Sequence, residues 1–375
     1  MRTSTHSNTR GSGRIVRTVL AASFKLGRIA GISVNLHWSV ALIALLLGGS
    51  LAPALGLAAA GAGVVLFLGS ILGHELSHAL VARRFGVGTR SIELWALGGM
   101  ARLEREAPSP KAEGWIAAAG PLASIAIAAV SLGAWFGLDA AGAVPTVASV
   151  LGWLGLVNFA LAVFNLMPGS PLDGGRIVKA VRWRIHGDRH RATRDAARAG
   201  TFVGWTIAGA GLWLSLTGNS GFLLLLTGAF IAVNAKSEIM SSYVAERLDG
   251  VKVRDLTWFG VASAGDDMDA DTMLWQRQRL GLAGAVAISG PDGELDGLVL
   301  EDQMWAIPAD QRPWVMLTQL MVPFSRLAQA DPDEDLANVL PRLNPRRPIV
   351  TVWRDGKLLG VVPPARLRER ILAVP

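Results

Sequence analysis

The feature that most constrains the fold of this chain is an apolar run from Trp38 to Gly73, which contains no charged residue. A helix needs roughly 20 residues to cross the hydrocarbon core of a bilayer, so this run is long enough for a helical hairpin through a membrane. Hydrophobic residues make up 51% and charged residues 17% of the 375-residue chain, a balance typical of membrane proteins. We therefore expect a multi-pass α-helical membrane protein.

Six apolar runs are predicted to span the membrane. They are approximately Leu36–Ala54, Leu57–Ala82, Trp115–Gly137, Thr146–Met167, Gly200–Leu216 and Gly221–Asn234. Lys and Arg gather in the N-terminal tail and in the connections after the second and fourth runs, whereas the other three connections contain neither. Because Lys and Arg accumulate on the cytoplasmic side, this distribution predicts six spans in a cell membrane with both termini in the cytoplasm.

Charge and cysteine content exclude several classes of function. The net charge is +7, but residues 251–375 hold 14 Lys or Arg and 17 Asp or Glu, so the basic excess lies between the apolar runs of residues 1–250. A membrane topology accounts for that placement, and we expect no nucleic-acid partner. Cysteine is absent, which excludes disulfides, thiolate metal sites and a cysteine nucleophile. Residues 1–25 are polar and basic, so no cleavable signal peptide is expected.

The chain is predicted to divide into four parts: a basic tail at residues 1–33, a six-span domain at 34–235, an amphipathic connector at 236–250 and a soluble α/β domain at 251–375. Within the second part, residues Ser91–Leu103 alternate in places and contain Gly98 and Gly99, which favours a β-like or re-entrant segment over a helix. An interfacial loop is the alternative.

The soluble part contains a weak internal repeat. Residues Gly290–Val299 are echoed by Arg354–Val362, and each copy predicts a strand, an Asp-Gly turn, a second strand and then a helix. Two βαββα units packed together would form one cytosolic domain.

The residues that carry chemistry lie in the second span. In His74-Glu75-Leu76-Ser77-His78 the two histidines are four residues apart, so on a helix both imidazoles can reach one zinc ion while Glu75 addresses the attacking water. A charged residue at the bilayer centre costs on the order of 2.5 to 3.5 kcal/mol, so Glu75 needs a partner or a polar cavity. An accidental match to the motif is the alternative.

A catalytic zinc site normally has three protein ligands and one open position. The third candidate is Asp173, which follows the fourth span in the segment Asn165–Arg176, with two prolines and three glycines. Its alternative role is that of a helix N-cap. The remaining histidines are less suitable, because His186 and His190 lie in a basic loop and His6 and His37 lie near the N-terminus.

Two asparagines are weaker candidates. Asn158 and Asn165 are seven residues apart on the fourth span, which places them on one helix face. They could donate hydrogen bonds to the oxyanion of a tetrahedral intermediate. Interhelical hydrogen bonding is an equally good explanation.

These motifs resemble those of the site-2 proteases, the intramembrane zinc metallopeptidases that cut membrane-embedded substrates in regulated intramembrane proteolysis. The resemblance covers nearly the whole chain. Its strong parts are Gly73–Leu80 and Asn165–Gly175, and its supporting parts are Leu26–Ile29, Asn35–Trp38, Gly98–Ala101 and Ala119–Pro121.

The resemblance implies a zinc metalloendopeptidase with one Zn²⁺ per subunit. By it, His74, His78 and Asp173 would bind the zinc and Glu75 would be the general base. The segment containing Gly98 and Gly99 would be an edge to which an extended substrate strand adds. Its partners would be the bilayer and transmembrane substrates, such as single-span proteins similar to anti-sigma factors.

Residues 251–375 resemble a tandem CBS pair, a type that often senses adenine nucleotides. The segments Gly297–Gln303 and Gly360–Arg366 depart from the pattern, because neither keeps both the hydroxyl and the aspartate that would hold a ribose and a phosphate. This departure argues against nucleotide sensing and leaves a packing role, or a homodimer formed through this region.

We expect Glu75 to take the proton from the attacking water and then deliver it to the leaving amine. Because helical peptide bonds are shielded by their own hydrogen bonds, the substrate must unwind locally first. Two other classes of function remain as alternatives: a zinc-binding transporter and a catalytically inactive membrane scaffold.

Overall fold

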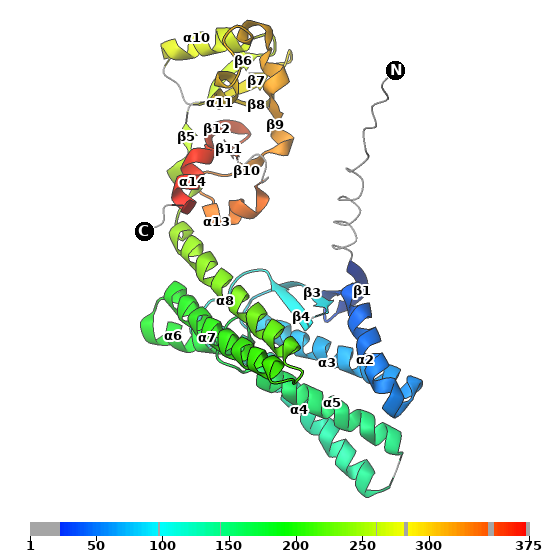
Figure 1. The fold of residues 1–375 in the computed structure, drawn as a ribbon. Helices are drawn as coiled ribbons and strands as arrows, with labels where there is room; N and C mark the ends of the chain where they lie inside the picture. Colours follow the sequence, from blue (N-terminus) through cyan, green and yellow to red (C-terminus); the bar gives the residue numbers. More distant parts are fainter. Residues whose placement is uncertain are drawn as a thin grey trace, which may run out of the picture. The chain divides into compact units, whose positions relative to one another are not determined.

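The structure of the chain is a computed structural model (Figure 1). It describes residues 23–96, 98–142, 144–259, 261–280, 284–343 and 349–372. The basic tail predicted at residues 1–33 lies mostly outside the described residues. The chain divides into two compact units between Met240 and Ser241, and each is described separately below.

Among the described residues, seven helices form the body of the first unit. They are α2 (Ser39–Leu55), α3 (Leu57–Arg84), α4 (Pro110–Ala140), α5 (Pro145–Asn165), α6 (Asp173–His186), α7 (Arg189–Leu216) and α8 (Phe222–Leu248). Five of them, α3, α4, α5, α7 and α8, are long and apolar enough to cross a membrane, and α2 is a shorter apolar helix of 17 residues. Each predicted span falls on one of these six helices, so the predicted membrane fold is confirmed.

The last span continues further than the sequence suggested. Helix α8 runs unbroken through Leu248, across the segment that we expected to be a separate connector at residues 236–250. Charged residues from Lys236 onward lower the hydropathy there, but no glycine or proline occurs between residues 229 and 248 to end the helix.

A four-stranded sheet accompanies the helices of the first unit. Its strands are β1 (Ser23–Ile29), β2 (Ile32–His37), β3 (Thr89–Trp95) and β4 (Gly98–Leu103), in the order β1-β2-β3-β4. Strands β3 and β4 form an antiparallel hairpin over the segment Ser91–Leu103, for which we expected a β-like or re-entrant structure. Strands β1 and β2 fall partly in the segment that we expected to be a tail, so the sheet is larger than predicted.

The sheet is anchored against the helix that carries the candidate site. Ile92 and Leu94 of β3 are buried with Ala79 of α3 and Val40 of α2, whereas the alternate residues of the strand are more exposed. This alternation fixes which face of the hairpin is buried. Strand β4 lies at the edge of the sheet and contacts α3.

Glycines allow several helices of the first unit to lie unusually close. A Cβ atom on Gly204 would lie 2.5 Å from the backbone nitrogen of Ala232, so α7 and α8 pack backbone to backbone at this point. Gly169 and Gly200 make a similar contact between α7 and the loop that precedes α6. Such small-residue contacts are typical of helix packing within membranes.

The second unit contains two four-stranded sheets. One has the order β6-β7-β8-β9 and the other β10-β11-β12-β5. The strands are β5 (Trp258–Phe259), β6 (Ala262–Gly265), β7 (Ala285–Ser289), β8 (Leu295–Leu300), β9 (Val322–Pro323), β10 (Ala328–Ala330), β11 (Val350–Arg354) and β12 (Lys357–Val362). The helices are α9 (Val253–Leu256), α10 (Ala270–Leu280), α11 (Glu301–Trp305), α12 (Leu317–Leu320), α13 (Leu336–Val339) and α14 (Pro364–Leu372).

The two sheets confirm the predicted internal repeat. In each, a parallel pair is followed by an antiparallel hairpin, β7–β8 in one and β11–β12 in the other. The hairpin turns place Gly293 and Gly356 at positive φ, as the repeated Asp-Gly pairs indicated. The described part of residues 251–375 is therefore the expected α/β domain.

Candidate metal centre

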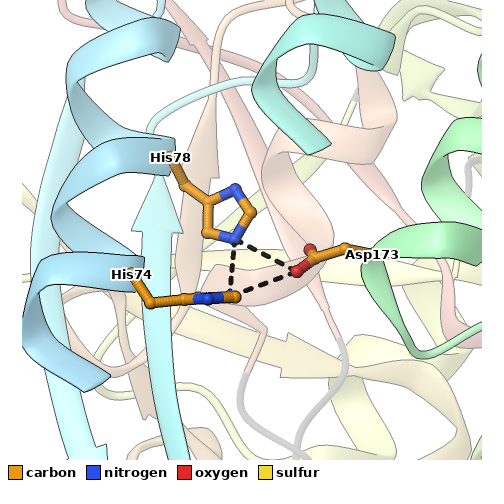
Figure 2. A group of neighbouring side chains, drawn as sticks. All are labelled: His74, His78 and Asp173. Carbon is orange, nitrogen blue, oxygen red and sulfur yellow. Dashed lines mark hydrogen bonds and ion pairs between the residues drawn. The ribbon is translucent and has the colours of Figure 1, made fainter. Parts of the chain in front are cut away.

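Helix α3 carries both histidines of the His-Glu-x-x-His motif. His74 and His78 lie one turn apart on the same face of the helix, and both are buried, at 4% and 5% relative exposure. Their Nε2 atoms are 3.2 Å from each other. The two rings therefore converge on one point (Figure 2).

Asp173, the first residue of α6, completes the group. Its Oδ2 atom lies 3.2 Å from Nε2 of His74 and 3.3 Å from Nε2 of His78. Figure 2 shows the carboxylate reaching the rings from a separate helix. Gly174 and Gly175 make this approach possible, because a Cβ atom on either would lie within 2.4 Å of the backbone of the preceding loop.

The spacing of these three atoms fits a zinc ion. Zinc bonds to histidine nitrogen and carboxylate oxygen are about 2.0–2.1 Å long, and a tetrahedron with such bonds has edges of about 3.3 Å. The three atoms are 3.2–3.3 Å apart, so they match one face of that tetrahedron. The fourth corner remains for water or substrate, as in catalytic zinc sites.

The carboxylate of Asp173 is in the charge state that a metal ligand needs. Burial alone would raise the pKa of Asp173, but hydrogen bonds to His74 and His78 outweigh it and hold the pKa below the ordinary value for aspartate. Asp173 is therefore ionised at neutral pH.

The other ring nitrogens also have partners, and both partners belong to α4. Nδ1 of His78 lies 2.6 Å from the backbone carbonyl oxygen of Ile116. Nδ1 of His74 lies 2.9 Å from Oγ of Ser124, which is completely buried. These contacts leave both Nε2 atoms directed at Asp173.

Gly120 of α4 lies beside the same two rings. A Cβ atom on this residue would lie 2.2 Å from Nε2 of His78 and 2.5 Å from Nε2 of His74. Such distances do not occur between real side-chain atoms, so only glycine leaves room at the converging nitrogens.

Glu75 follows His74 on α3 and points to the sheet. A Cβ atom on Gly99 would lie 2.3 Å from Cγ of Glu75, so β4 passes directly over this side chain. The backbone amide of Ala101, also on β4, donates a hydrogen bond to the Glu75 carboxylate. A proton acceptor thus lies between the edge strand and the histidines.

An ion pair supports the start of α6. Nε of Arg176 lies 2.9 Å from Oε1 of Glu113, a buried residue in the first turn of α4. The charges of Asp173 and Glu238 also act on Arg176. The first turn of α6, which carries Asp173, is therefore fastened to α4.

The structure does not bring the other predicted residues into the group of three. Asn158 is completely buried, and its Nδ2 atom donates to the carbonyl of Leu154 in its own helix, at 2.9 Å. Asn165 is the last residue of α5. Within the described ranges, no hydrogen bond joins either asparagine to His74, His78 or Asp173. Gly98 has a φ of +133°, and no atom would lie within 4 Å of a Cβ there.

Sequence reasoning missed the contribution of α4. Gly120 and Pro121 were noted only as part of a resemblance, and Ser124 and Ile116 were not identified. A serine in an apolar helix is common, and a backbone carbonyl leaves no sequence signal. The one signal that could have been used is the spacing of residues 116, 120 and 124, which lie four apart on one helix face.

Comparisons with known proteins identify the family of this chain. Residues 62–140 and 136–208 match the sequence model described as peptidase family M50. The chain is 37% identical over 362 residues to Rip3 of Mycobacterium tuberculosis, which is named as a zinc metalloprotease, and 92% of each chain is covered. It is 30% identical over 255 residues to the zinc metalloprotease MJ0392 of Methanocaldococcus jannaschii, covering 67% of this chain and 71% of that protein.

Two solved structures are also similar to parts of the chain. The site-2 protease from Methanocaldococcus jannaschii is 29% identical, with 58% of this chain and 95% of that chain covered and a TM-score of 0.44. The CBS domain of a bacterial CNNM/CorC family Mg²⁺ transporter is 16% identical, with 38% and 88% covered and a TM-score of 0.29.

Proposed function

The chain belongs to peptidase family M50 and is a membrane zinc metalloprotease, and we propose that it hydrolyses peptide bonds of transmembrane or membrane-proximal protein substrates. The proposal is supported by one observation above all. The three atoms that fit a zinc ion lie at the meeting point of α3, an apolar helix long enough to cross a membrane, and the first turn of α6.

In the proposed site His74, His78 and Asp173 hold the zinc ion. A bound zinc would polarise the scissile carbonyl and make water a nucleophile near neutral pH. The chain's own residues then move the proton: Glu75 takes it from the attacking water and gives it to the leaving amine. The charges of His74, His78 and Asp173 all act on the Glu75 carboxylate, which supports this role.

We assign substrate binding to the free edge of β4. An extended peptide can add to an exposed strand edge through main-chain hydrogen bonds. Glu75 lies against Gly99 of this strand, so a peptide paired with β4 would pass close to the proton acceptor. A helical substrate would have to unwind before pairing, which favours substrates with small or helix-breaking residues near the cut.

We also propose that Asn165 stabilises the developing oxyanion, since it lies at the end of α5, eight residues before Asp173. Asn158 is less suited, because Nδ2 already donates to Leu154. The charge distribution of the connections supports an orientation with both termini in the cytoplasm. Release of single-span regulatory proteins by regulated intramembrane proteolysis would be the corresponding cellular role.

The test compares wild type with Glu75→Gln in vesicles that contain a panel of single-span substrates. The measurements are cleavage products by mass spectrometry and zinc per protein chain. We expect cleavage by wild type, a loss of about 10²–10⁴-fold in the variant and equal zinc content in both. Unchanged cleavage in the variant would exclude Glu75 as the base, and absence of cleavage of any substrate by wild type would favour a scaffold or transporter.

A further inference from the structure

We propose that one face of α4, formed by Ile116, Gly120 and Ser124, positions both imidazoles for zinc, and that Ser124 is a positioning residue that acts through His74. The inference rests on the proposed function, because it concerns the same metal centre. It adds residues outside the His-Glu-x-x-His motif and the segment around Asp173.

The three residues form one row along the helix. They are four residues apart, so they lie on the same face of the helix in successive turns. Ile116 offers a carbonyl to His78, Gly120 leaves space at the converging Nε2 atoms, and Ser124 offers a hydroxyl to His74. Each member of the row thus meets a different part of the ring pair.

The contact with Ile116 fixes the tautomer of His78. A carbonyl oxygen only accepts hydrogen bonds, so Nδ1 of His78 must carry the proton at a distance of 2.6 Å. A metal ion would displace the proton that Nε2 shares with Asp173, so the ring would bind it through Nε2 while Nδ1 keeps its proton. Ligating histidines in proteins almost always donate their second N–H in this way.

The contact with Ser124 orients the ring of His74, and it depends on a side chain. A hydroxyl can donate or accept, so the direction of this bond follows from metal binding: a ring that binds zinc through Nε2 carries its proton on Nδ1. Oγ of Ser124, which is completely buried and lies 2.9 Å from Nδ1, is then the acceptor. Removal of this hydroxyl leaves that N–H without its partner and the ring without its orientation. Loss of such a partner commonly weakens metal binding by about 10–100-fold.

The experiment uses purified full-length protein and two substitutions on α4. Ser124→Ala removes the hydroxyl, and Ser131→Ala is the control, because Ser131 is also a buried serine of the same helix, two turns further along. Zn²⁺ affinity is measured by competition with a chelator, and Co²⁺ is used as a spectroscopic probe of ligand geometry. Thermal unfolding of the metal-free proteins reports whether each variant folds.

We expect Ser124→Ala to weaken Zn²⁺ binding by about 10–100-fold and to change the Co²⁺ spectrum, with an unfolding midpoint for the metal-free protein close to that of wild type. Ser131→Ala should bind both metals as wild type does. Ser124→Thr keeps the hydroxyl and should restore binding, which keeps the proposal testable if the alanine variant does not fold.

The two proposals fail in different ways. If wild type binds zinc and cuts substrate but Ser124→Ala binds both metals as wild type does, the positioning role is wrong and the proposed function stands. Equal weakening by Ser131→Ala would also overturn it, because the effect would then come from packing of α4. If wild type binds no stoichiometric zinc, the proposed function itself is wrong.

Discussion

A Cβ atom on Gly120 would lie 2.2 Å from Nε2 of His78, inside the space that a metal bond would need. The neighbouring helix therefore constrains the metal centre as strongly as the histidine motif does. Because a Cβ atom is held by the backbone of α4, the two rings would have to move aside to relieve the clash.

Substitution of Gly120 by alanine should abolish zinc binding. The new methyl group would displace both rings, so the three ligand atoms would no longer lie at tetrahedral spacing. Zinc per chain, measured after dialysis, should fall from one to near zero. Gly133→Ala is the control, since a Cβ atom there would have no neighbour within 4 Å. Retention of zinc by Gly120→Ala would show that the rings converge differently.

Loss of the third ligand should be visible without any substrate. In Asp173→Ala the two imidazoles would remain, but the carboxylate that joins them would be missing, and zinc affinity should fall by at least about 100-fold. A chelator competition measures this directly. Asp139→Asn, at the exposed end of α4, should leave affinity unchanged. Equal affinity in Asp173→Ala and wild type would remove Asp173 from the ligand set.

Substitution of Gly99 should separate zinc binding from catalysis. An alanine Cβ would lie 2.3 Å from Cγ of Glu75 and force this side chain to move, while the histidines stay in place. We expect cleavage to fall by about 10²–10⁴-fold, as for loss of a general base, with zinc content retained. Gly69→Ala on α3 is the control, because its Cβ would meet nothing within 4 Å. The idea fails if Gly99→Ala cuts substrate at the rate of wild type.

The ion pair between Arg176 and Glu113 should contribute to stability. Breaking a fully buried pair costs about 3–5 kcal/mol, and since the Arg176 side chain is 32% exposed we expect about 2–3 kcal/mol for Glu113→Ala. Glu93→Ala breaks a more exposed pair with Arg102 and should cost less than about 1 kcal/mol. Unfolding in detergent would compare them, and equal costs would contradict the prediction.

The second unit should lose a stabilising interaction in acid. The backbone N–H of Asp333 and the side chain of Arg354 both bond the Asp331 carboxylate and hold its pKa below the ordinary aspartate value. A lowered pKa in the folded state stabilises the fold above the unfolded pKa, and this benefit is lost as pH falls through the folded pKa.

The measurement is the difference in unfolding midpoint between wild type and Asp331→Asn. This difference should be present at pH 6 and should shrink steadily as the pH is lowered below about 4. Asp310→Asn, at an exposed aspartate of the same unit, should show a smaller difference throughout. A constant difference across this pH range would exclude the mechanism.

The sequence predicted the parts of the fold that depend on local patterns. Long apolar runs located six of the seven described helices of the first unit, all but α6, and the Asp-Gly pairs located both hairpins of the second. Alternation and two glycines indicated β-like structure at residues 91–103, without showing that it is a hairpin. Family membership, metalloprotease activity and zinc dependence were also predicted, and the comparisons confirm them.

The parts that were missed depend on tertiary contacts. Strand β1 and the first residues of β2 fall in the segment assigned to a basic tail, and the rest of β2 falls in the predicted membrane domain. Strand β2 pairs with β3, whose residues come 58 positions later in the chain, as Ser33 with Ser91. Helix α8 continues to Leu248, through most of the segment predicted as an amphipathic connector.

For the metal centre, the sequence indicated the candidate ligands and base but not the residues of α4 that contact them. His74, Glu75 and His78 are given by one local motif, and Asp173 by the unusual composition of its segment, and these roles remain predictions. Ser124 and Ile116 have no motif. Their importance follows only from how α4 packs against α3.

His78 is bonded to a main-chain carbonyl and His74 to a side-chain hydroxyl, so substitutions in α4 affect the two histidines differently. Every amino acid carries a main-chain carbonyl, so no single codon change at position 116 can remove the acceptor that His78 uses. The hydroxyl that serves His74 disappears with most single codon changes at position 124. Substitutions at these two positions will therefore remove the hydrogen-bond partner of His74 far more often than that of His78.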